Sequence, residues 1–190
     1  CYESDLKYFR WNTVLDFQGK DETLLHTIAD RKEHQPEAIS YYKDTSKTET
    51  TDSCSNFGSL QAIKVVKRNQ SGVILELELD FQNGAVSVQS EYNMRAILGC
   101  GITNINLLDG SSVEMSILPS AYISIQEKGD GTYAVLGGGY GHGIGMSQNG
   151  AQKLCGQGFD YKRILNYFYQ DTELTELYQP QNTTKEEGGA

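Results

Sequence analysis

Hydrophobic and polar residues alternate through the middle of the chain, between Leu60 and Val88. An alternation of period two places the apolar side chains on one face of a β-strand. The turn residues at 69–72 (NQSG) and the pair Asn83-Gly84 interrupt the alternation, and Asn-Gly is a strong hairpin signal. The pattern predicts a meander of three antiparallel strands.

Further strands are predicted on both sides of this meander, because aromatic and β-branched residues favour extended structure. They are KYFRWNTVLDF (7–17), SVEMSIL (112–118), AYISIQEK (121–128) and TYAVLGGG (132–139). The sequence GDG forms a turn between the last two. No internal repeat is present.

Apolar residues at helical spacing predict four short helices. Two of them are DETLLHTIADRK (21–32) and SEYNMRAILG (90–99). The other two follow the last predicted strand: QNGAQKLC (148–155), with Ser147 suited to cap it, and a helix that begins at Asp160. The fold class is therefore α+β, with a strand-rich antiparallel core and short helices, the main ones late in the chain.

Two segments lack any apolar period. Residues 33–56 contain the polar run KDTSKTETTDSCSN, and we expect them to form a loop excursion on the surface. Residues 180–190 are expected to be a disordered tail. Residues 1–179 are then part of a single domain. The chain does not begin with Met and shows no signal peptide, so it is interpreted as a fragment or processed form.

The chain of 190 residues has a net charge of −9, which excludes a nucleic acid or an anionic membrane surface as a partner held by a basic face. No run of about 18 apolar residues is present to span a membrane. A neutral, sugar-like ligand would not be repelled. The twelve tyrosines are compatible with stacking on carbohydrate, or with a place in the core.

The four cysteines are widely spaced, at Cys1, Cys54, Cys100 and Cys155. Three disulfide pairings are possible, and buried free thiols are the alternative. A zinc site would require a closely spaced pair of ligands, and this sequence has none. No metal site and no cofactor are predicted.

The segment GGGYGHGIGMSQNGA (137–151) is the most glycine-rich part of the chain. It matches neither the dinucleotide fingerprint nor the phosphate-binding loop. Glycines alternate strictly with larger residues, as Gly139, Tyr140, Gly141, His142, Gly143, Ile144, Gly145 and Met146. In an extended strand the glycines would share one bare face, and the Tyr140 ring and the His142 imidazole would share the other. This predicts the wall of a ligand groove, because the ring can stack on a sugar and the imidazole can bond its hydroxyls. The alternative is close backbone packing, with His142 in the core.

The glycine-rich segment and the residues that follow it resemble a known family. GYGHGIGMSQNGAQ, followed by GFDYKRILNYFYQDTEL, is similar to the C-terminal portion of the stage II sporulation protein D / amidase enhancer (SpoIID/LytB) domain. Members of that family carry a His-Gly-x-Gly-Met-Ser-Gln-x-Gly-Ala block and then a tyrosine-rich helix. The sequence YFRW resembles the mid-domain strand of the family.

The resemblance implies a peptidoglycan lytic transglycosylase that acts on denuded glycan strands during sporulation, engulfment or cell-wall remodelling. Such enzymes cleave the bond between MurNAc and GlcNAc and leave a 1,6-anhydroMurNAc end. The resemblance also implies a cell-wall amidase as a partner. It implies an extracytoplasmic location on the cell-wall side of the membrane, with a tether in a missing N-terminal segment.

The substrate-binding residues carried over from the family are Tyr140, His142, Ser147 and Gln148, with Gly139, Gly141, Gly143 and Gly145 as backbone spacers. Arg10 and Trp11 are further candidates, and a core position is the alternative for Trp11. The catalytic glutamate of the family precedes the strand that YFRW resembles. No catalytic acid is therefore assigned within this chain. Four carboxylates of the strands and helices, at Glu76, Glu78, Glu91 and Glu114, are expected to be solvated. Asn149 stands where the family usually has an aromatic residue.

Two other functions are compatible with the sequence. The first is a non-catalytic module of the same fold that binds glycan or stimulates an amidase. The second is a thiol enzyme with Cys155 as nucleophile and His142 as base. A helix is predicted between these two residues, and Cys155 lies near its end, where the helix dipole does not activate a thiol.

Overall fold

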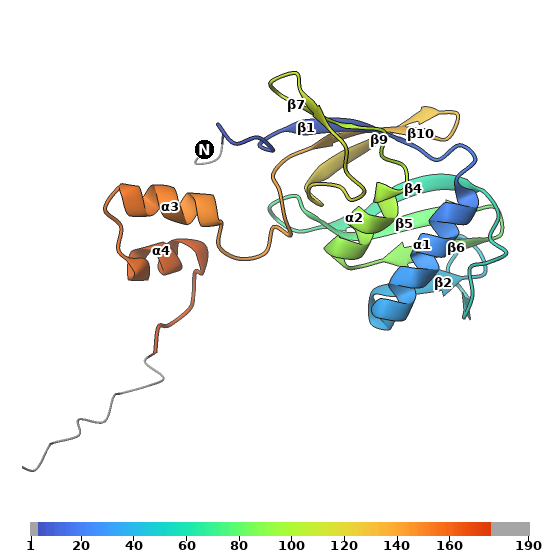
Figure 1. Cartoon of the computed structure of the whole chain (residues 1–190). Coiled ribbons are helices and arrows are strands. Elements are labelled where there is room, and N and C mark those ends of the chain that lie inside the picture. The colour runs from blue at the N-terminus through green and yellow to red at the C-terminus, as the bar shows by residue number, and fades with distance from the viewer. Residues whose placement is uncertain (1–3, 176–190) are drawn as a thin grey trace, which may run out of the picture. The chain divides into compact units, whose positions relative to one another are not determined.

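In the computed structural model, which describes residues 4–175, the strands form two antiparallel five-stranded sheets (Figure 1). The described chain divides into two compact units, one that ends at Ile144 and one that begins at Gly145. Both sheets belong to the first unit. Together with four short α-helices they confirm the α+β class.

The first sheet has the strand order β8-β7-β1-β10-β9. Its strands are β1 (Trp11–Asp16), β7 (Ile105–Leu107), β8 (Ser112–Val113), β9 (Ile123–Gly129) and β10 (Thr132–Gly137). The strand predicted at 7–17 therefore begins only at Trp11. The strand predicted at 112–118 is reduced to the two residues of β8, while β7 was not predicted.

The second sheet has the order β3-β2-β6-β5-β4. Its strands are β2 (Ile39–Tyr42), β3 (Thr50–Thr51), β4 (Leu60–Arg68), β5 (Ile74–Phe81) and β6 (Gly84–Val88). The meander of β4, β5 and β6 confirms the prediction, and Phe81 pairs with Gly84 across the Asn-Gly turn.

The expectation of a continuous surface loop at 33–56 is wrong for part of that segment. Helix α1 (Asp21–His34) continues into it, a short 3₁₀-helix (Pro36–Ala38) follows, and β2 then pairs with β6. Ile39 and Tyr41 are buried, with Val88 and Val86 as their cross-strand partners. Two inward-facing side chains are enough to hold this strand, but they are too few to produce a visible apolar period.

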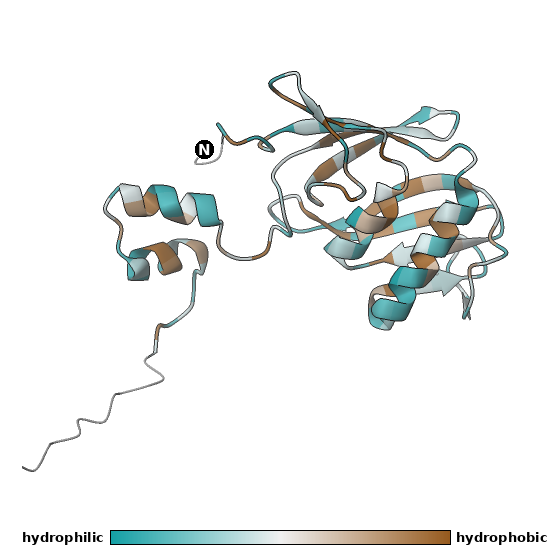
Figure 2. Ribbon diagram, viewed as in Figure 1, coloured by the Kyte–Doolittle hydropathy of each residue, from teal (hydrophilic) through white to brown (hydrophobic). Residues whose placement is uncertain are grey.

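Helices α1 and α2 (Glu91–Gly99) lie side by side over one face of the second sheet (Figure 1). Apolar side chains from both helices are fully buried: Leu24, Ile28, Met94, Ile97 and Leu98. They join residues of both sheets in one hydrophobic core. Figure 2 shows hydrophobic residues along the strands and alternating hydrophilic and hydrophobic residues along α1, as expected for an amphipathic helix.

The second unit contains α3 (Gln148–Gly156) and α4 (Tyr161–Phe168). The hydroxyl of Ser147 accepts a hydrogen bond from the backbone N–H of Gly150, and the carboxylate of Asp160 accepts one from Arg163. Both caps were predicted, because a polar side chain before a helix satisfies an otherwise unpaired N–H. None of the helices among residues 4–175 is long and apolar enough to cross a membrane. The tail predicted at 180–190 lies outside the described residues.

Strand β5 places a charged cluster on the second sheet. The expectation that Glu78 is solvated is wrong: its residue is only 5% exposed, and its carboxylate forms ion pairs with Lys47 and with Lys64. Lys64 also pairs with Asp80. Burial raises the pKa of Glu78, but the hydrogen bond and charge of Lys47, together with the charge of Lys64, outweigh burial and leave that pKa below its usual value.

The lowered pKa of Glu78 predicts a contribution to acid unfolding. A carboxylate with a depressed folded-state pKa stabilises the fold above its unfolded value of about 4.3, and this stabilisation is lost as pH falls through the folded pKa. Glu78→Gln should therefore lower the free energy of unfolding by about 1 kcal/mol at pH 7, a modest value because Lys64 is half exposed.

The measurement is urea unfolding at a series of pH values from neutral to acidic. As pH falls through the lowered folded-state pKa of Glu78, the curves of Glu78→Gln and the unchanged chain should converge. The exposed Glu114 provides a control, and Glu114→Gln should leave stability unchanged throughout. A constant gap between Glu78→Gln and the unchanged chain at every pH would contradict this account.

Candidate functional site

The glycine-rich segment that follows β10 is not an extended strand. Strand β10 ends at Gly137, and the φ angles of Gly139, Gly141 and Gly143 are +78°, +104° and +71°. Side-chain-bearing residues rarely adopt positive φ, whereas glycine does so readily. The prediction of a pleated segment with one bare face is therefore wrong. Every second residue is glycine because the backbone turns there.

The start of this segment is fixed to the loop that precedes β9. The N–H of Gly138 donates to the carbonyl of Tyr122 at 3.0 Å, and the buried Ser120 hydroxyl donates to the carbonyl of Gly138 at 2.7 Å. Further along, the N–H of Gly141 donates to the carbonyl of Pro119 at 2.8 Å. The backbone carbonyls of Pro119 and Tyr122 and the hydroxyl of Ser120 therefore define the path of the glycine segment.

Trp11 holds the same segment from the first strand. Its indole N–H donates to the carbonyl of Gly139 at 3.1 Å, and its ring fills the space beside Gly137, where an added Cβ would lie 2.1 Å from the indole. Trp11 is only 3% exposed, so its ring cannot stack on a sugar. The core alternative is correct for Trp11, and its role is to position the glycine segment.

Tyr140 presents its ring at the surface, where it is 66% exposed. Its inner support is the ring of Tyr8, with the centroids 4.8 Å apart and the planes tilted by 33°. The backbone carbonyl of Tyr8 also accepts the N–H of Gly139 at 2.8 Å. Tyr140 is therefore an aromatic surface with a fixed backing, as stacking on a flat ligand requires.

His142 is exposed, and a local hydrogen bond sets its tautomer. The backbone N–H of Ile144 donates to Nδ1 of His142 at 2.9 Å. Because Nδ1 accepts this bond, the neutral imidazole carries its proton on Nε2. His142 can then offer an N–H donor to an oxygen of a ligand.

The remaining predicted site residues fall into two groups. Arg10 is exposed in the first unit, where its guanidinium lies over the Phe9 ring at 4.2 Å and donates to the carbonyl of Phe9 at 2.7 Å. Ser147 and Gln148 belong to the second unit, in which Ser147 caps α3 and Gln148 is its first, exposed residue. The structure thus brings Arg10, Tyr140 and His142 into one unit and places Ser147 and Gln148 in the other.

Four contributors to the site were not predicted: Tyr8, Pro119, Ser120 and Tyr122. Only Tyr8 had a visible signal, as an aromatic residue within the KYFRW stretch. Pro119, Ser120 and Tyr122 act through backbone or hydroxyl hydrogen bonds, which composition does not reveal.

The other carboxylates named in the sequence analysis, Glu76, Glu91 and Glu114, were also located. Glu91 forms an ion pair with Arg95 at 3.0 Å, and Arg95 is buried with its Nε–H donating to the carbonyl of Leu118. Glu76 accepts the hydroxyl hydrogen of Ser87 at 2.9 Å, and Glu114 is exposed. Glu91 and Glu76 are thus paired rather than simply solvated.

The cysteines and the metal-ligating residues were also located. Cys54, Cys100 and Cys155 are free thiols, and Cys1 lies outside the described residues. Cys155 is the penultimate residue of α3, far from the activating end of the helix. Within residues 4–175 no group of three or more His, Cys, Asp or Glu side chains could hold a metal ion.

Comparison with known proteins places the chain in a family. The family model described as "Domain of unknown function (DUF8618)" matches residues 31–145, which is more than half of the chain. The chain belongs to the DUF8618 family. The matched residues contain β2 to β10 and most of the glycine segment, including Tyr140 and His142. This DUF8618 region therefore covers most of the first unit.

Two curated proteins of Bacillus subtilis (strain 168) are also similar to this DUF8618 chain. The amidase enhancer is 34% identical over 89 residues, which are 47% of this chain and 12% of that protein. Stage II sporulation protein D is 36% identical over 76 residues, which are 40% of this chain and 22% of that protein. The matches thus span less than a quarter of either relative. They confirm the resemblance to the SpoIID/LytB domain.

Proposed function

We propose that this chain is the C-terminal portion of a cell-wall protein that binds peptidoglycan glycan strands through its glycine-rich segment. The observation that carries the proposal is the exposed ring of Tyr140, which is backed by Tyr8 and stands two residues before the Nε2–H donor of His142. Sugar rings are bound in this way, by an aromatic face and hydrogen-bond donors to their hydroxyls. The net charge of −9 opposes the binding of a polyanion.

The relatives supply the biological context of the proposal. Their names refer to the enhancement of an amidase and to stage II of sporulation. We place this chain in the same setting, on the cell-wall side of the membrane, with a cell-wall amidase as a partner. Residues 1–179 would be part of a single SpoIID/LytB-type domain, and Gln148 is a separate glycan-binding candidate within the second unit.

For the whole protein we propose lytic transglycosylase activity. That reaction requires a carboxylic acid which protonates the leaving oxygen and then, as a carboxylate, removes a proton from a hydroxyl of the sugar. The described carboxylates Glu91 and Glu78 are held in ion pairs. The resemblance to the SpoIID/LytB domain assigns the acid to the part of the domain that precedes this chain in the family.

The second candidate function is a non-catalytic module that holds glycan or stimulates an amidase. The exposed Tyr140 and His142 favour binding, and binding alone is enough for this role. The two functions differ in their products. A transglycosylase releases 1,6-anhydro ends, and a binding module releases none.

The test is a pull-down of the 190-residue chain with purified denuded glycan strands. The bound protein is quantified, and the soluble products are analysed by mass spectrometry. Tyr140→Ala should weaken glycan binding about tenfold, because stacking of a sugar on an aromatic ring contributes on the order of 1 kcal/mol or more. His142→Ala should weaken binding to a smaller extent, and no anhydro product is expected from this chain by itself.

Tyr92 provides the control, since it is an exposed tyrosine (47%) on α2 of the same unit. Tyr92→Ala should leave glycan binding unchanged. If Tyr140→Ala and Tyr92→Ala bound glycan equally well, the assignment of the glycine segment to glycan binding would be wrong. Anhydro products from this chain would place the acid within its 190 residues, and Glu91→Gln would then be the first variant to assay.

A further inference from the structure

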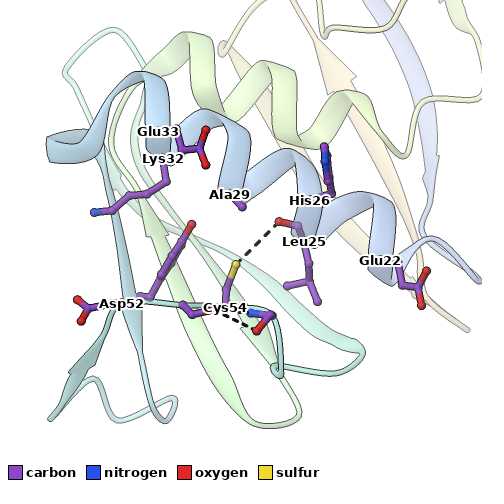
Figure 3. Close-up of a pocket in the computed structure, with 11 residues that line it drawn as sticks. Glu22, Leu25, His26, Ala29, Lys32, Glu33, Asp52 and Cys54 are labelled. Atoms are coloured by element: carbon purple, nitrogen blue, oxygen red, sulfur yellow. Dashed lines mark hydrogen bonds between the residues drawn. The ribbon is translucent and has the colours of Figure 1, made fainter.

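A pocket of about 430 Å³ lies in the first unit, next to the second sheet. It is formed between α1 and residues 52–55 (Figure 3). It shares no residue with the glycine segment, and the proposed function does not use it. Its volume is in the range of pockets that enclose a small molecule or a side chain. Helix α1 and the chain around Asp52 and Cys54 form opposite sides of the pocket (Figure 3).

The inner surface of the pocket is apolar. It is made by Leu25 and Ala29 of α1, by the ring of Tyr41 from β2, and by Cys54. Tyr41 and Cys54 are buried at the base, with 4% and 3% of their surface exposed. The Cys54 thiol donates to the carbonyl of Leu25 at 3.8 Å. Burial raises the pKa of this thiol, so the base of the pocket stays uncharged near neutral pH.

Carboxylates dominate the charged part of the lining. Glu22, Glu33 and Asp52 line the pocket, and none of them forms an ion pair with any residue among 4–175. His26 also lines it, and its imidazole is exposed. A surface of this kind, with an apolar base and an acidic opening, complements a cation that is carried on an aliphatic stem.

The single lysine of the lining does not neutralise these carboxylates. The ammonium group of Lys32 donates to the carbonyls of Pro36 at 2.7 Å and of Ile39 at 2.5 Å. These bonds hold it at the junction between the short 3₁₀-helix and β2, where its Nζ lies 5.7 Å from the centroid of the Tyr41 ring. It forms no ion pair with Glu22, Glu33 or Asp52.

We propose that this pocket binds a lysine or arginine side chain presented by a partner protein. The methylene groups of such a side chain would contact Leu25, Ala29 and Tyr41, while its cationic end would lie near Glu33 and Asp52. An acidic peptide or an anionic ligand is excluded by the same charges. The inference stands independently of glycan binding, which concerns a different part of the unit.

The test is a fluorescence anisotropy titration of the chain with a short labelled peptide of alternating leucine and lysine. A matched peptide with glutamate in place of lysine is titrated alongside. The lysine peptide should bind and the glutamate peptide should not. The double variant Glu33→Gln/Asp52→Asn should weaken binding about three- to tenfold, as expected for two partly exposed ion pairs, and added salt should weaken binding to the unchanged chain.

Two further variants locate the binding. Glu114→Gln/Glu127→Gln removes the same two charges from exposed positions elsewhere in the unit and should leave the affinity nearly unchanged. Ala29→Phe fills the pocket and should abolish binding, with circular dichroism confirming that the variant is folded.

Equal weakening by the two double variants would overturn the proposal, because the attraction would then depend on net charge alone. Tighter binding of the glutamate peptide would also overturn it. Glycan pull-down of the same variants should be unaffected, so failure here is distinguishable from failure of the proposed function.

Discussion

Trp11→Ala should lower the free energy of unfolding by about 3–5 kcal/mol, the range for a large aromatic residue removed from a core. The ring is nearly fully buried, and its N–H is the donor to the Gly139 carbonyl. A domain of this size has only about 5–15 kcal/mol of stability in total, so the variant would be close to its unfolding threshold. Urea unfolding followed by circular dichroism measures the effect.

A second substitution at the same position separates packing from hydrogen bonding. Trp11→Phe keeps most of the apolar contact but has no N–H to donate, so it should cost less than the alanine variant. It should also release the glycine segment, which is expected to appear as faster amide hydrogen exchange at Gly139 and Gly141. If Trp11→Phe left both stability and exchange unchanged, the bond from Trp11 to Gly139 would have no role in positioning the segment.

Gly137→Ala should be the next most damaging substitution, with a loss of about 2–3 kcal/mol from overpacking. The new methyl group would lie 2.1 Å from the Trp11 ring, and that ring is enclosed in the core and cannot move aside. The measurement is urea unfolding followed by the fluorescence of Trp11, the one tryptophan of the chain. Both the midpoint and the starting emission should change, because the indole is displaced.

Gly156→Ala is the matched control, since it makes the same chemical change within α3. No atom lies within 4 Å of its added methyl group, and its φ is not positive. Alanine favours helix over glycine by about 1 kcal/mol, so this variant should be neutral or slightly stabilising. Equal losses for the two alanine variants would show that glycine content, rather than the contact with Trp11, determines the result.

The parts of the fold that could be predicted are those set by local patterns. The alternation from Leu60 to Val88 and the turn at Asn83-Gly84 define β4 to β6, and polar residues before α3 and α4 define their caps. Strand β2 could not be predicted in this way. Its side chains at Ile39 and Tyr41 are buried by the distant strand β6, and that pairing is a tertiary contact.

The candidate site was predicted in part, and for a reason that the structure corrects. The strict glycine alternation did mark the segment that presents Tyr140 and His142. However, the alternation reflects backbone turns at positive φ and not the pleat of a strand. Glycine at every second position is compatible with a pleated strand and also with a backbone that turns at each glycine. Trp11 was named because tryptophan often binds sugars. The packing of its ring against Gly137 could not be seen before the register of β1 and β10 was known.

The four edge strands of the two sheets have a consequence for self-association. Strands β8 and β3 have two residues each, which are too few to bind a further strand. Strand β4 is longer, but it carries Lys64 and Lys67 and its register with β5 shifts three times. Strand β9 carries Glu127 and Lys128 near its C-terminal end, and its pairing with β10 is irregular there. Short, charged and irregular edges oppose intermolecular sheet extension. The first unit should therefore resist growth into amyloid-like fibrils even when it is concentrated.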